Sequence, residues 1–142
     1  TKIDQEAAGK KIQFKISIKN VGKGDVIWGS DEISVLGRCN PNRVGRLDRK
    51  DLDRMKLEKF KVGGVNLLDP NGDGNLNDNK CAPFADGTQN LVKLFNGEAF
   101  VICTYDIPSD IQTAFTTPID IELRYAYRST ISKPIQIKKL GG

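Results

Sequence analysis

Apolar and polar residues alternate strictly along residues 11–19. The apolar side chains occupy every second position; they are Ile12, Phe14, Ile16 and Ile18. Successive side chains of a strand point to opposite faces of a sheet, so these residues share one face. The pattern predicts a half-buried strand, which ends in the turn-forming residues 20–25.

The last third of the chain alternates in the same way. Residues 100–107 have an inward face that consists of Val101, Cys103, Tyr105 and Ile107. Residues 119–127 alternate without interruption, residues 128–130 predict a turn, and residues 131–137 predict a returning strand. Because Pro134 has no backbone N–H, we expect this last strand at a sheet edge or with a bulge.

The middle of the chain follows no single period. Its apolar side chains include Met55, Leu57, Phe60 and Val62. We expect a short helix or an irregular crossover that leads into a strand near residues 59–62. Shorter strands are expected at residues 26–28 and 33–36.

Many short strands at regular intervals favour an all-β fold. We expect one immunoglobulin-like β-sandwich domain over residues 1–142, with a long, partly irregular insertion at residues 38–98. The chain length of 142 residues suits a single domain. The polar residues 1–9 are interpreted as an N-terminal arm, and the start at Thr1 as a processed or trimmed end.

Two segments near the start resemble a known family. Residues 16–25, Ile-Ser-Ile-Lys-Asn-Val-Gly-Lys-Gly-Asp, and residues 31–35, Asp-Glu-Ile-Ser-Val, resemble the opening strands of immunoglobulin-like domains in archaeal surface proteins. These proteins include CARDB-like adhesion modules and the globular heads of archaeal pilins and archaellins. Asn96-Gly97-Glu98 and the closing segment with Tyr125 and Tyr127 are also similar. The resemblance implies a cell-surface sandwich with an adhesive or filament-forming role.

Residues 69–78, Asp-Pro-Asn-Gly-Asp-Gly-Asn-Leu-Asn-Asp, have the D-x-[DN]-x-[DN]-G spacing of an EF-hand-type calcium loop. Calcium takes about six to eight oxygen ligands, which alternate residues of a curled loop supply. The candidate ligands are Asp69, Asn71, Asp73, Asn75 through its carbonyl, Asn77 and Asp78. The twelfth position, normally a glutamate, is Lys80, so Asp78 or Asp86 would have to complete the shell. The alternative is a plain turn rich in Asx residues and glycine.

Three cysteines are present and form no CxxC pair, so a zinc site is not indicated. Cys39 and Cys81 lie in polar loops and are the preferred disulfide partners. Pairing of Cys81 with Cys103 is the alternative that the sequence leaves open. A disulfide is expected in an oxidising compartment, so the cysteines, the calcium-type loop and the resemblance together predict an extracellular or cell-surface location.

The composition argues against catalysis and against nucleic-acid binding. The chain has no histidine, which removes the commonest general base and metal ligand. The net charge of +4 comes from basic residues interleaved with acidic ones, and aromatic residues make up only 7% of the chain. A nucleic-acid site would need fewer acids and more stacking platforms. No apolar run is long enough to cross a membrane.

The sequence therefore predicts a non-enzymatic structural or adhesive module, stabilised by calcium. It would act as a surface spacer or a filament subunit and would associate with its own copies or with other surface proteins. The alternative is a calcium-dependent domain that binds a glycan or a peptide. The aromatic candidates for such a site are Trp28, Tyr105, Tyr125 and Tyr127, each of which more often packs in a core.

Overall fold

A computed structural model describes residues 2–5, 10–28, 49–86, 90–108, 116–129, 131–139 and 141. The regular structure of the described part consists of strands and two short 3-10 turns, so the predicted all-β fold is confirmed. The strands are β1 (Lys2–Gln5), β2 (Lys11–Lys19), β3 (Asp25–Ile27), β4 (Arg54–Val62), β5 (Val65–Asn66), β6 (Cys81–Ala82), β7 (Leu91–Lys93), β8 (Glu98–Asp106), β9 (Ile119–Arg124) and β10 (Ala126–Arg128). The 3-10 turns are η1 (Arg49–Asp51) and η2 (Leu76–Asp78).

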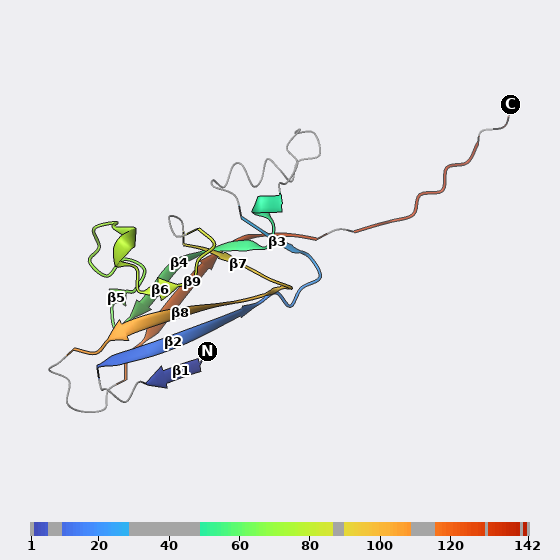
Figure 1. The fold of residues 1–142 in the computed structure, drawn as a ribbon. Coiled ribbons are helices and arrows are strands. Elements are labelled where there is room, and N and C mark those ends of the chain that lie inside the picture. The colour runs from blue at the N-terminus through green and yellow to red at the C-terminus, as the bar shows by residue number, and fades with distance from the viewer. Residues whose placement is uncertain are drawn as a thin grey trace.

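The strands form two larger antiparallel sheets and one ribbon (Figure 1). The first sheet has the order β1-β2-β8-β6. In the second sheet β4 is central, because Lys56 pairs with Leu91 of β7 on one side and with Arg124 of β9 on the other. Strands β3 and β10 pair separately as a two-stranded ribbon.

The longest ladder joins β2 to β8 over their whole length, from the Lys11–Asp106 pair to the Lys19–Glu98 pair. Its inner face is apolar, as the alternation of both segments predicts. Phe14 lies opposite Cys103, and Ile16 lies opposite Val101. These inward residues are buried, so both strand predictions are confirmed.

The two sheets share one core. The rings of Phe14 on β2 and Phe60 on β4 meet edge to face, with their centroids 5.8 Å apart. Leu57, Phe60 and Val62 of β4 are completely buried. The structure thus has two packed β layers, while the specific immunoglobulin-like arrangement stays a prediction.

Strand β4 corrects the expectation that residues 38–98 are an insertion. It lies at the centre of the second sheet and supplies buried side chains to the shared core. A bulge between Leu57 and Lys59 shifts the register by one residue, so Met55 and Leu57 before it point the same way as Phe60 after it. The bulge explains why no single period fits this segment.

The stretch predicted as one strand at residues 119–127 divides into two. Strand β9 pairs with β4, whereas β10 pairs with β3, and Tyr125 separates them. The proposed N-terminal arm is also corrected in part, because Lys2–Gln5 pairs antiparallel with β2 of the same chain. The strand predicted at residues 33–36 lies outside the described residues.

No strand forms at residues 131–137, which the sequence predicts to return along the sheet. Residues 131–139 have no regular structure, are exposed, and extend away from the sheets in Figure 1. The register that a tight turn after β10 would impose disfavours such a strand. A two-residue turn at 129–130 would place Ile135 opposite Arg124 and Ile137 opposite Glu122, which would turn both isoleucines toward the charged face of β9.

We expect Phe60→Ala to lower the free energy of unfolding by about 3–5 kcal/mol, because it removes the buried ring that joins the two sheets and leaves a cavity. Denaturant unfolding followed by Trp28 fluorescence measures this change. Val21→Ala is the control, since Val21 is 88% exposed and its truncation should change stability by less than about 0.5 kcal/mol. Equal effects of the two substitutions would contradict the shared core.

Candidate functional site

Backbone hydrogen bonds join the ends of the loop predicted to bind calcium to both sheets. The Leu67 N–H donates to the carbonyl of Phe60 on β4 at 2.8 Å, and the Lys80 N–H donates to the carbonyl of Leu67 at 2.8 Å. The Thr104 N–H of β8 in turn donates to the Lys80 carbonyl at 2.9 Å. The base of residues 69–78 is therefore held by the backbone of both layers.

Within the loop, side-chain oxygens accept backbone N–H groups. The two carboxylate oxygens of Asp69 accept from Gly72 at 2.9 Å and from Gly74 at 3.1 Å. Asp73 accepts from the Asn75 N–H at 2.8 Å. Both glycines have positive φ, at 69° and 74°, a conformation that other residues rarely adopt. These bonds are those of a tightly capped turn.

The other candidate ligands lie in the same loop and also have partners. Asn75 caps η2 by accepting from the Asn77 N–H at 3.1 Å, and Asn71 donates its amide to Asp78 at 2.7 Å. Among the described residues, no three acidic, cysteine or histidine side chains converge as a metal site. Each carboxylate oxygen can accept a second bond, so calcium binding stays a prediction beside the capped-turn role.

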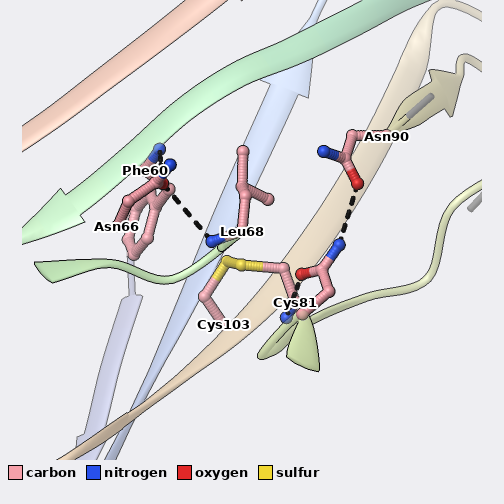
Figure 2. The surroundings of a disulfide bond; sticks show 7 residues. Phe60, Asn66, Leu68, Cys81, Asn90 and Cys103 are labelled. Carbon is pink, nitrogen blue, oxygen red and sulfur yellow. Dashed lines mark hydrogen bonds between the residues drawn. A yellow bond between two sulfur atoms is a disulfide. The ribbon is translucent and has the colours of Figure 1, made fainter. Parts of the chain in front are cut away.

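A disulfide lies directly beside this loop (Figure 2). Cys81 of β6 and Cys103 of β8 are cross-strand neighbours, with an S–S distance of 2.04 Å. The preferred pairing of Cys39 with Cys81 is therefore wrong, and the alternative with Cys103 is found. Sequence spacing gives no register between strands, and the register puts Cys81 opposite Cys103. Cys39 lies outside the described residues.

Asparagine side chains fix the chain around the disulfide. The Asn66 carbonyl oxygen accepts from the N–H groups of Phe60 and Leu68, both at 3.4 Å (Figure 2). Asn79 accepts from the Cys81 N–H at 2.9 Å and donates to the buried Asn90 at 2.8 Å. Both ends of the loop are thus held to the core by hydrogen bonds and by a covalent link.

The four aromatic candidates do not form one exposed binding face. Tyr105 is buried. The hydroxyl of Tyr127 accepts from the Gly24 N–H at 2.6 Å, and its ring lies so close to Gly22 that no side chain would fit there. Tyr127 therefore stabilises the turn that follows β2. Trp28 is half-buried, and Tyr125 is exposed.

Sequence reasoning missed an apolar groove of about 360 Å³ at the edge of the first sheet. Its apolar lining includes Pro83, Phe84, Val92, Phe95, Ala99 and Phe100. Phe95 and Phe100 are 69% and 46% exposed. The available signal was the position of Phe100, which lies on the outward face of an otherwise correctly predicted strand.

The outer face of β9 carries the acidic residues Asp120 and Glu122. The Lys59 ammonium lies 3.2 Å from Glu122 and 3.4 Å from Asp120. Hydrogen bonds to Glu122 and then to Asp120 raise the pKa of Lys59 above its usual value. Lys61 also lies opposite Asp120, so both acidic side chains of β9 face lysines of β4 across the ladder.

Comparison with protein-family models, curated proteins and solved structures finds no match to the chain. The resemblance to archaeal surface domains is therefore a prediction that rests on the sequence motifs alone. Among the described residues, no helix has the length and apolar character needed to span a membrane.

If the loop binds calcium with a Kd of about 10⁻⁴–10⁻³ M, millimolar calcium raises the unfolding midpoint relative to EDTA. Calcium at about ten times Kd adds about 1.4 kcal/mol. Asp73→Ala should lower the EDTA midpoint, because it removes a cap, and should also abolish the calcium-dependent difference. Lys80→Glu, which restores the usual twelfth ligand, should enlarge that difference. Equal midpoints in calcium and EDTA for the native chain would contradict calcium binding.

We expect Cys81→Ala to lower the free energy of unfolding by about 3 kcal/mol, because the bond closes a loop with a sequence separation of 22. Cys39→Ala is the matched control and should leave that bond intact. Peptide mapping without reduction should recover Cys81 linked to Cys103. Recovery of a Cys39–Cys81 peptide would contradict the structure.

Proposed function

We propose that this domain is a non-catalytic structural module of an extracellular or cell-surface protein, of the kind found on archaeal cells, and that it assembles with its own copies or with other surface proteins. It would serve as a surface spacer or filament subunit. The Cys81–Cys103 disulfide is compatible with an oxidising location. Calcium, if bound, would stabilise the loop of residues 69–78.

One observation carries this proposal, namely the exposure of the C-terminal isoleucines. Ile131, Ile135 and Ile137 are 92%, 85% and 91% exposed. Isoleucine is among the residues most often buried in folded proteins. Three of them in one short segment leave apolar side chains in water, which is typical of a surface that a partner covers.

The second candidate function is calcium-dependent binding of a peptide or glycan, which the groove around Phe84, Phe95 and Phe100 favours. Exposed rings in a concave apolar site suit a ligand with an apolar face. The groove does not account for the exposed C-terminal isoleucines. Self-assembly accounts for them, so we favour the structural function.

The native chain should form dimers or larger assemblies as its concentration rises, without any added ligand. Size-exclusion chromatography with light scattering over a wide range of concentrations measures the mass. Phe95→Ala should leave this assembly intact, because the groove belongs to the second candidate function. A monomer at every concentration, together with glycan or peptide binding that Phe95→Ala abolishes, would contradict the structural function.

A further inference from the structure

We propose that residues 131–139 of one copy add as an antiparallel strand to the free edge of β9 in a second copy. This inference rests on the proposed function and deepens it, because it names the segment that reaches out and the surface that receives it. Its evidence is the pattern of the C-terminal segment, the open edge of β9, the position of Pro134 and the charges on both sides.

The C-terminal segment has isoleucines at strand spacing but pairs with no strand in the part of the chain that the structure describes. Ile131, Ile135 and Ile137 fall on positions of one parity, so an extended chain carries them on one face, together with Lys133. All three are almost fully exposed. A strand with one apolar face gains stability only when a sheet edge receives its backbone and a core receives that face.

The outer edge of β9 supplies such a site. Among the described residues, β9 pairs only with β4, along its length from Ile119 to Arg124. Ile119 and Ile121 lie opposite Val62 and Phe60, which are completely buried, yet they are themselves 39% and 37% exposed. These two side chains are therefore only partly covered along this edge.

Backbone N–H and C=O groups of β9 also face this outer edge. The N–H and C=O groups of Phe60 are both bonded on the β5 side, to Asn66 and Leu67, so they do not face Ile121. In an antiparallel ladder this makes Phe60 and Ile121 a pair without mutual hydrogen bonds. The N–H and C=O of Ile121 then face the free edge, where an added strand can bond to them.

Pro134 fits this placement and fixes its register. In one register, the backbones of Ile135 and Ile137 form hydrogen bonds with those of Ile121 and Ile119. The backbone of Pro134 then faces away from β9, so its missing N–H removes no hydrogen bond between the strands. The isoleucines of both strands then lie on the core side. Gln136 falls opposite Asp120 on the outer face, where the Cβ atoms of directly paired residues are about 4.5–5.5 Å apart.

Charge distinguishes this edge from the phenylalanine groove as the receptor. The C-terminal segment contains three lysines and no acidic residue. Lys138 would lie diagonally across from Asp120, on the face where Asp120 and Glu122 share one lysine. The groove instead has lysine ammonium groups over its exposed rings, 5.2 Å from Phe95 and 4.8 Å from Phe100.

A second copy is a better donor than the same chain. In Figure 1 the C-terminal segment runs away from β9. A tight turn after β10 would bring Ile135 and Ile137 to the charged face of their own β9, as described above. A strand from another copy is free of this turn and can adopt the register that buries both isoleucines.

Cysteine cross-linking between two differently labelled chains tests the proposal. One full-length chain carries Gln136→Cys and the other carries Asp120→Cys, with Cys39→Ser in both. Mixed under mild oxidation, they should form a covalent heterodimer at least tenfold faster than when the second chain instead carries Ser17→Cys. Ser17 is the control because it is exposed on β2, on the outer face of the first sheet.

Three results would overturn the proposal. The first is an equal rate with the β2 control. The second is cross-linking only within one chain that carries both cysteines, which would show that the segment folds back on its own β9. The third is cross-linking of Ser132→Cys to Pro118→Cys with none to Arg124→Cys, because antiparallel pairing puts Ser132 opposite Arg124.

Point variants separate this inference from the proposed function. Ile135→Asp should raise the dissociation constant of self-assembly by about 10- to 100-fold, the equivalent of one buried isoleucine. Ser132→Asp places the same charge on the outer face and should change the dissociation constant less than about threefold. If the native chain assembles but Ile135→Asp assembles equally well, the C-terminal segment is not the donor and the structural function stands. If the native chain never assembles, both fail.

Discussion

The ladder between β2 and β8 is the contact on which the rest of the structure depends. It joins two nine-residue strands along their whole length and presents an unbroken apolar face to the second sheet. Strand β8 also carries Cys103, which bonds to Cys81, and Thr104, which holds one end of the loop of residues 69–78. If this ladder slipped by one residue, the core face, the disulfide and the loop base would all be lost together.

The part of the fold that the sequence predicts is the part with uninterrupted alternation. The face of β2 and the face of β8 follow directly from it. Only the second half of β4, near residues 59–62, was expected as a strand, because the bulge after Leu57 breaks its period, although Leu57 is as completely buried as Phe60. The preferred cysteine pairing was wrong for a different reason. Spacing along the chain does not encode which strand lies beside which, and only the β6–β8 register brings Cys81 to Cys103.

The candidate sites, too, were predicted only in part from the sequence. The loop of residues 69–78 is visible in the sequence as a motif, but a motif does not reveal that both oxygens of Asp69 already accept backbone N–H groups. A strand was predicted at residues 131–137 from the spacing of its isoleucines, and it does not form within the described chain. What the sequence did not supply was the partner, because residues 131–139 pair with no strand among the described residues. The proposed contact with a second copy would supply it.

Hydrogen exchange of the native chain, followed by mass spectrometry at low and high protein concentration, tests the central claim most directly. The account predicts that residues 131–139 exchange freely when dilute and become protected as concentration rises. It predicts that β9 gains protection over the same range, while β2 and β8 are protected throughout. Protection of the C-terminal segment that does not change with concentration, or no protection at any concentration, would contradict the account.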